Sequence, residues 1–333
     1  MIDRRGFLSA MITLAAAPSV AMGQQSDRAR NVPRIAFLCA SSCSALPHPL
    51  SPADQAFARV LERGGYVIGK NVVLDMAAVG VSERGIDAAA RRLASRHPTV
   101  ILVSSSATAH AARRATRSAS IVMMGIADPV EEGLIDSLHR PGGNLTGVAL
   151  PFVSLVSKQI ELLKEIQPSL RKIAVLFNPA TRQHERLARA ERTVGSLGVS
   201  LHPVPATTAT DVPGALAAVK DVRADAIVVL EHLSTTFAIR DIVLFALQER
   251  LPAAAVNSRF VQGGGLLAYG PDEVDVFERS ATYVVRLLGG NKTNELPVEE
   301  PTRYELSLNI ATARTLRLVV PHALLIRASQ VVE

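Results

Sequence analysis

The chain has 333 residues, 48% of them hydrophobic, and a net charge of +6, which is enough material for two globular lobes of roughly 100–200 residues each. Aromatic residues make up only 4% and tryptophan is absent, so the core must be built from Ala, Val, Leu and Ile. The basic residues are scattered and not interleaved with aromatic ones, which argues against a nucleic-acid-binding surface. This composition suits an α/β protein whose parallel strands are buried on both faces.

The first 23 residues are typical of a secretory signal. Arg4 and Arg5 open a stretch that carries no further charge until Asp27, and small residues occupy the −3 and −1 positions of a cleavage site near Gly23. The paired arginines resemble those of a twin-arginine export signal. A membrane anchor is the alternative, but polar residues and a proline dilute the apolar run below the ~20 residues that a spanning helix needs.

We therefore expect an exported, periplasmic protein whose mature chain starts near Gln24, with residues 24–33 as a linker. Loss of residues 1–23 removes two arginines and one aspartate, which leaves a net charge of about +5. No second segment of the sequence is apolar enough to span a bilayer.

The two cysteines, Cys39 and Cys43, follow the first predicted strand. In an oxidising compartment they are compatible with a short-loop disulfide or with two free thiols, and their spacing does not decide between these states. The pair is too small for a metal site, and the eight histidines form no local cluster.

Apolar runs alternate with amphipathic helical patterns through the first half of the chain. Each run of four to seven residues ends in small or polar residues, and this alternation predicts βαβ units with parallel strands. Strands are expected at 34–38, 71–79, 99–106, 120–125 and 145–150, and helices at 52–63, 83–96 and 107–117.

The same pattern starts again at residue 172, where KIAVLFNP resembles the first strand, RIAFLCAS. The economical interpretation is a pair of similar Rossmann-like lobes with parallel sheets. Strands are expected at 172–179, 200–206, 225–232, 252–258 and 265–270, and helices at 181–197, 211–222 and 234–250.

Asp128 stands where a buried strand ends, within GIADPVEEGLIDSLHRPGGNLTG. In open parallel sheets, ligands bind in the crevice outside the carboxyl ends of the strands. The simpler prediction is that Asp128 caps a helix that begins at Pro129, with two glutamates in its first turn. The Pro-Gly-Gly-Asn turn would end that helix before the strand at 145–150.

Small polar side chains follow the predicted strands in both halves. Each alone is more often a helix cap or a turn residue than a ligand contact, but together they face one cleft. Hydroxyl and backbone N–H groups at a helix start can hold a carboxylate. The candidate ligand-binding residues are Ser41, Ser42, Ser104, Ser105, Ser106 and Asp128 in the first half, and Asn178, Thr181, Glu231, Asn257 and Tyr269 in the second.

The segments that resemble familiar enzyme motifs each lack a residue that the motif requires. GGYVIGKN has Asn71 in place of the hydroxyl residue of a phosphate loop and precedes a strand instead of following one. HERLA has Ala188 where a zinc-binding helix needs its second histidine. We therefore predict a protein that is not an enzyme and needs no cofactor or metal.

Several segments resemble the substrate-binding components of ABC transporters, and more narrowly the group that includes the tryptophan- and tyrosine-uptake binding proteins. They are ADPVEEGLIDSLHRPGGNLTGV, KIAVLFNPA, VQGGGLLAYGPD and the ending from LPVEEPTRYELSLN onward. The resemblance spans residues 30–333 and implies a type I periplasmic binding fold, with three crossings that act as a hinge.

By this resemblance, lobe one comprises residues 34–150 and 269–290, and lobe two comprises 151–268 and 291–333. Ser105 and Asp128 match polar strand-end positions of the family's first lobe, and Asn178, Asn257 and Tyr269 match positions of its second lobe. The chain departs from the family in the loop from Cys39 to Pro49 and at Glu231-His232.

The resemblance implies a solute receptor that acts as a monomer and delivers a small polar ligand, such as an amino acid, to an inner-membrane permease with its ATPase. The ligand carboxylate would lie on the helix start at 104–106, and an ammonium group would lie near Asp128. A periplasmic sensory module of the same fold is the alternative, and an exported enzyme with a cryptic site is a third reading.

Overall fold

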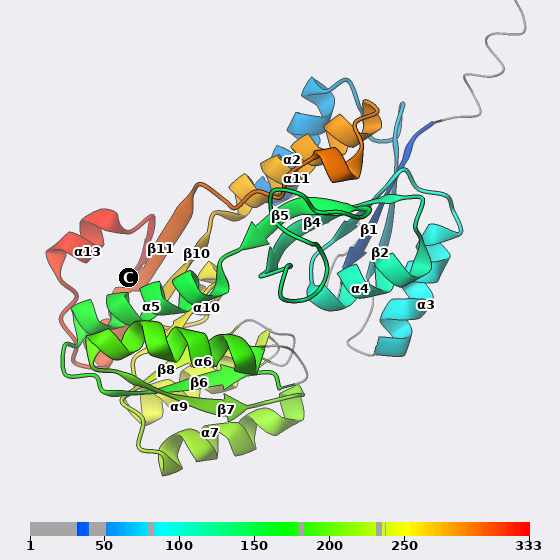
Figure 1. The fold of residues 1–333 in the computed structure, drawn as a ribbon. Helices are drawn as coiled ribbons and strands as arrows, with labels where there is room; N and C mark the ends of the chain where they lie inside the picture. The colour runs from blue at the N-terminus through cyan, green and yellow to red at the C-terminus, as the bar shows by residue number, and fades with distance from the viewer. Residues whose placement is uncertain (1–31, 40–50, 79–82, 180–182, 231–234, 237) are drawn as a thin grey trace, which may run out of the picture.

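The computed structural model describes residues 32–39, 51–78, 83–179, 183–230, 235–236 and 238–333. The described chain forms two α/β lobes, each built around its own sheet, with extended segments passing between them (Figure 1). The predicted fold class is therefore confirmed.

Sheet one, in lobe one, has five parallel strands in the order β2-β1-β3-β4-β5. Its strands are β1 (Arg34–Cys39), β2 (Val73–Ala78), β3 (Val100–Val103), β4 (Ser120–Ala127) and β5 (Leu145–Leu150). Its helices are α2 (Pro52–Arg63), α3 (Glu83–Ala94), α4 (Ser106–Ala115) and α11 (Glu273–Leu288).

Both faces of sheet one are covered, because successive strand residues point to opposite sides. In β3, Ile101 and Val103 join the core under α3 and α4, whereas Val100 and Leu102 join the core under α2 and α11. This double burial explains why the strands read as continuous apolar runs in the sequence.

Sheet two, in lobe two, repeats this order as β7-β6-β8-β9-β10 and adds β11, antiparallel to β10, and then β12. Its strands are β6 (Lys172–Phe177), β7 (Ser200–Pro205), β8 (Ala226–Val229), β9 (Ala253–Ala255), β10 (Leu267–Pro271), β11 (Tyr304–Asn309) and β12 (Gln330–Val332).

The helices of lobe two are α5 (Phe152–Ile166), α6 (Gln183–Val194), α7 (Val212–Asp221), α9 (Ile239–Gln248), α10 (Ser258–Gln262), α12 (Ile310–Thr315) and α13 (His322–Arg327). Three short 3₁₀ turns complete the described elements: η1 (Gly195–Leu197), η2 (Ala209–Asp211) and η3 (Thr293–Glu295). Helices α5 and α6 cover one face of sheet two, and α7 and α9 cover the other.

Local capping signals explain where several helices start. Helix α2 begins after Ser51, whose hydroxyl and the carboxylate of Asp54 form a reciprocal capping box, with Pro52 at the first helical position. Helix α11 begins after Asp272, which accepts a hydrogen bond from the Val274 N–H.

One predicted helix is absent, and helix α5 was not predicted. The segment after Asp128 forms turns instead of a helix, because Asp128 and Gly133 both adopt positive φ angles, of 42° and 64°. Helix α5 was missed, although polar residues such as Lys158 and Glu165 recur at helical spacing along its less buried side.

The boundary of lobe one also differs from the sequence-based one. Strand β10 belongs to sheet two as far as Pro271, and the chain then stays on lobe one well beyond residue 290. Leu296 and Val298 are buried in the lobe-one core, and Glu299 bridges to Val148 of β5. This returning segment covers the open edge of sheet one, which explains why it remains there until about residue 300.

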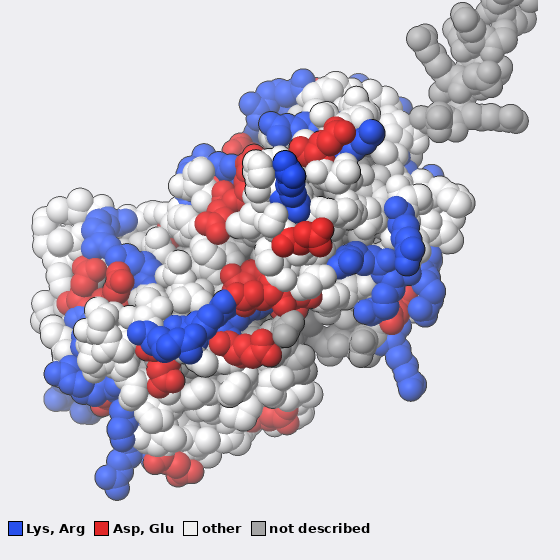
Figure 2. All heavy atoms as spheres, in the orientation of Figure 1, with Lys and Arg blue, Asp and Glu red and all other residues white. Residues whose placement is uncertain are grey.

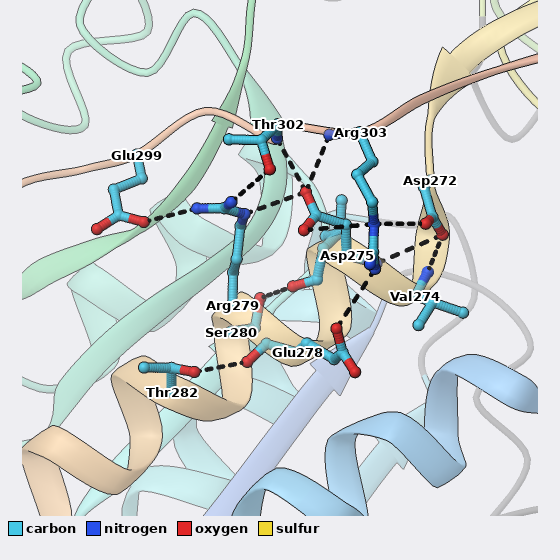
Figure 3. A network of polar contacts seen from close by, with 11 residues as sticks. Asp272, Val274, Asp275, Glu278, Arg279, Ser280, Thr282, Glu299, Thr302 and Arg303 are labelled. Atoms are coloured by element: carbon cyan, nitrogen blue, oxygen red, sulfur yellow. Dashed lines mark hydrogen bonds and ion pairs between the residues drawn. The ribbon is translucent and has the colours of Figure 1, made fainter.

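A polar network fixes this returning segment to α11 (Figure 3). The Asp275 carboxylate accepts hydrogen bonds from the Thr302 N–H at 2.9 Å and from the Arg279 guanidinium at 3.0 Å. Arg279 also donates to Glu299, at 2.9 Å. Burial alone would raise the pKa of Asp275, but these hydrogen bonds and the charge of Arg279 hold it below its ordinary value.

Gly147 is required by close packing of β5 on β4. Its φ is 125°, and an added Cβ would lie 2.5 Å from the backbone N and O atoms of Met123. We expect Gly147→Ala to lower the free energy of unfolding by more than about 2 kcal/mol in urea denaturation. Gly143→Ala, in the open turn before β5, should change it by less than about 0.5 kcal/mol, and equal effects of the two changes would contradict this account.

Candidate ligand cleft

The carboxyl ends of strands from both sheets meet between the lobes. In Figure 1, the carboxyl ends of β1 and β2 point toward lobe two. The carboxyl ends of β6 and β7 lie on the right-hand side of lobe two in the same view. Four of the predicted site residues lie outside the described residues, in segments that follow β1, β6 and β8 in the sequence: Ser41, Ser42, Thr181 and Glu231.

Ser104, Ser105 and Ser106 lie at the start of α4, at the carboxyl end of β3. Ser105 is the N-cap and exchanges hydrogen bonds with Thr108, so its hydroxyl serves the helix. Ser104 is exposed and Ser106 is half-exposed, and the structure gives neither side chain a partner among the described residues. Their hydroxyls and the first N–H groups of α4 thus form a small set of donors at a positive helix end.

Asp128 lies at the carboxyl end of β4 and faces two guanidinium groups from lobe two. One carboxylate oxygen accepts a hydrogen bond from the Phe152 N–H at 3.4 Å, and the other lies 3.3 Å from Arg186 Nε and 3.7 Å from Arg189. Burial raises the pKa of Asp128, and the charges of the two arginines do not fully offset that effect.

Lobe two contributes two asparagines with structural hydrogen bonds. Asn178 is buried, and its side chain donates to the Thr207 carbonyl at 3.2 Å. Asn257 caps α10 by accepting from the Arg259 N–H at 2.9 Å. Asn257 also lines a cavity of about 40 Å³ at the carboxyl ends of β8 and β9, together with apolar side chains such as Phe260.

Tyr269 lies on β10, one of the segments that lead between the lobes, and away from the helix starts. Its ring stacks on Tyr304 with 5.9 Å between the centroids, and its carbonyl accepts from Gln159. The side chain packs against the core under α5. The other described site residues follow strands within their own lobes, whereas Tyr269 belongs to the packing beside the crossings.

Sequence reasoning missed a charged contact between the lobes. Arg186 of α6 donates to Glu132 at 2.6 Å and to the Ala127 carbonyl at 3.2 Å, and Arg189 pairs with Glu131. Figure 2 shows acidic and basic side chains gathered in the middle of the molecule, where the loop after β4 meets α6. The only signal in the sequence was an acidic pair beside a strand end and arginines three residues apart in a predicted helix.

Other features of the described residues bear on chemistry. They contain no group of three or more His, Cys, Asp or Glu side chains arranged to hold a metal ion. Within the same residues, no helix has both the length and the apolar character needed to cross a bilayer. Cys39 is disulfide-bonded, and Cys43, the other cysteine of the chain, lies outside the described residues.

The capping role of Ser105 has a measurable consequence. We expect Ser105→Ala to lower the free energy of unfolding by about 1 kcal/mol, because the Thr108 N–H loses its acceptor. Thermal or urea unfolding should show no such loss for Ser104→Ala, whose hydroxyl caps nothing. An equal loss in both variants would mean that the helix start is not organised as described.

Residues 48–332 match the protein family described as ABC transporter substrate binding protein. A tyrosine-binding protein from Clostridioides difficile is 26% identical over 278 residues, which are 81% of this chain and 78% of that protein. A conserved domain protein from Vibrio cholerae has a solved structure that matches with a TM-score of 0.82 at 26% identity, covering 90% of this chain and 100% of the other.

Two more distant structures show the same fold. A domain from Streptococcus pneumoniae, solved in complex with L-Trp, matches with a TM-score of 0.79 at 19% identity, over 91% of this chain and 100% of that one. A leucine-binding protein from Thermotoga maritima matches with a TM-score of 0.58 at 14% identity, over 77% and 82% of the two chains. The fold is that of the type I periplasmic binding proteins, and the chain belongs to the ABC transporter substrate-binding protein family.

Proposed function

We propose that this chain is the exported solute-binding component of an ABC importer, and that its ligand is an amino acid with an aromatic side chain, such as tyrosine or tryptophan. The ligand binds between the lobes, stabilises their closed arrangement and is passed to an inner-membrane permease with its ATPase. A ligand that touches both lobes favours closure, because only a difference in affinity between open and closed states can shift that equilibrium.

The observation that carries this proposal is the family match over residues 48–332, combined with a fold of two lobes that each contain their own sheet. The ligand class is supported by the printed descriptions of two relatives, a tyrosine-binding protein and a domain solved with L-Trp. Export to the periplasm is supported by the signal-like residues 1–23, and we propose that the receptor acts there as a monomer.

The ligand carboxylate is assigned to the start of α4. Ser104 and Ser106 offer hydroxyls without protein partners among the described residues, and a helix N-terminus favours a negative group. The cavity beside Asn257 lies on the opposite lobe and has mainly apolar walls, but at about 40 Å³ it is too small for an aromatic ring, so the ring end is not assigned to it.

Asp128 receives a different role from the one that the sequence favoured. Its carboxylate already faces Arg186 and Arg189, so these guanidinium groups occupy the position that a ligand ammonium group would need. We assign it to the junction between the lobes.

Isothermal titration of the mature chain with L-tyrosine and L-tryptophan tests the function. We expect at least one to bind, and tyramine, which lacks the carboxylate of tyrosine, to bind at least about tenfold more weakly than tyrosine. Ser104→Ala should weaken amino-acid binding by about tenfold, whereas Ser118→Ala, beyond the other end of α4, should leave it unchanged.

If neither L-tyrosine nor L-tryptophan binds, the proposed ligand class is refuted. Equal binding of tyrosine and tyramine would refute the carboxylate site while leaving the ligand class intact.

A further inference from the structure

Arg186 is the most deeply buried charge at the junction of the lobes. Its side chain is only 3% exposed. It lies on α6 of lobe two, yet the oxygen atoms that it contacts among the described residues all belong to lobe one. They are the Ala127 carbonyl, Glu132 at 2.6 Å, Asp128 at 3.3 Å and Glu131 at 3.9 Å.

The lobe-two side holds the guanidinium in place without neutralising it. Its central carbon lies 5.6 Å from the centre of the Phe152 ring, at the start of α5. A buried guanidinium that loses its acidic partners is left uncompensated, which is strongly unfavourable. If the lobes separate at this point, the Arg186 guanidinium must therefore either keep its partners in lobe one or become hydrated.

The acidic loop, residues 128–132, is attached to the first crossing between the lobes, where the chain passes from β5 to α5. The Asp128 N–H donates to the Leu150 carbonyl at 3.2 Å, and the Phe152 N–H donates to the Asp128 carboxylate. Asp128 holds a left-handed φ of 42°, a conformation that a non-glycine residue keeps only when its surroundings fix it. The loop thus moves with the crossing, beside the axis of any hinge motion.

The Arg186–Asp128 pair is close but not aligned. Asp128 Oδ2 and Arg186 Nε are both buried, and neither has a hydrogen-bond partner, although they lie 3.3 Å apart. A small rotation of α6 against the loop therefore changes the energy of this pair substantially, because both charges are largely shielded from water.

We propose that Arg186, the Ala127 carbonyl, Asp128 and Glu132 form a clamp that limits how far the ligand-free lobes open. Arg186 is then a positioning residue: it raises ligand affinity by keeping the lobes near their closed arrangement, without touching the ligand. The opening range is a property of the free protein, and only the effect on affinity rests on the function proposed above.

Arg189 supplies a matched comparison. It lies on the same helix and pairs with the same acidic loop through Glu131, but it is 38% exposed and its partner is 36% exposed. Such solvent-screened pairs contribute little. The clamp predicts a large effect of Arg186→Ala and almost none of Arg189→Ala.

The first test uses ligand-free protein. Hydrogen exchange followed by mass spectrometry should show that Arg186→Ala speeds exchange at least about tenfold in peptides covering residues 127–134 and 183–190. Exchange in the core strands of both sheets should stay as in the wild type. Small-angle scattering should give a larger radius of gyration for Arg186→Ala, and wild-type values for Arg189→Ala.

The second test uses the amino acid that binds in the titration above. Arg186→Ala should weaken its binding by about tenfold or more, and Arg189→Ala by less than about twofold. If neither amino acid binds the wild type, the proposed function fails, and the ligand-free measurements still decide the clamp.

If Arg186→Ala showed the wild-type hydrogen-exchange rates in these peptides and the wild-type radius of gyration, the proposed clamp would be wrong. If that variant does not fold, Glu132→Gln takes its place, since it removes the charge nearest to Arg186 and leaves the guanidinium intact. The same increases in exchange and in radius are expected from it, and their absence would equally overturn the proposal.

Discussion

The two-lobed structure depends on a reciprocal exchange of helices. Strand β5 leaves sheet one and its helix, α5, packs on sheet two, whereas β10 leaves sheet two and its helix, α11, packs beside α2 on sheet one. Because each lobe buries the apolar face of a helix that follows a strand of the other sheet, neither core is complete without both halves of the chain. The exchange also keeps the crossings short, so relative motion of the lobes is a rotation about them.

Much of this fold could be predicted from the sequence because its signals are local. Parallel strands buried on both faces read as apolar runs, and the likeness of Arg34–Leu38 to the run at residue 172 revealed the repeat. One failure has a physical cause. Asp-Pro-Val-Glu-Glu obeys every local rule for a helix start, but the backbone at Asp128 turns left-handed to serve contacts with the other lobe. Helix α5 was missed although its polar residues, Lys158 and Glu165 among them, recur at helical spacing.

The sequence indicated where the candidate site residues lie relative to the strands, but not which residues they contact. Topology places strand ends at one edge, so the positions of Ser104, Ser106 and Asn257 after their strands could be predicted without coordinates, and their contact with a ligand stays a prediction. The partners of Asp128 could not, because nothing local in the sequence shows that the loop after β4 lies against α6. Arg186 therefore read as one exposed basic residue among many, although it is almost fully buried between the lobes.

Under the proposed function, a ligand closes the two lobes over a shared cleft. The most direct measurement is the distance between spin labels on the lobes, at Arg92→Cys on α3 and Asp221→Cys on α7, both exposed positions, by pulsed electron paramagnetic resonance. The account predicts that a saturating aromatic amino acid shortens and narrows the distance distribution. Saturated binding with an unchanged distribution would contradict it.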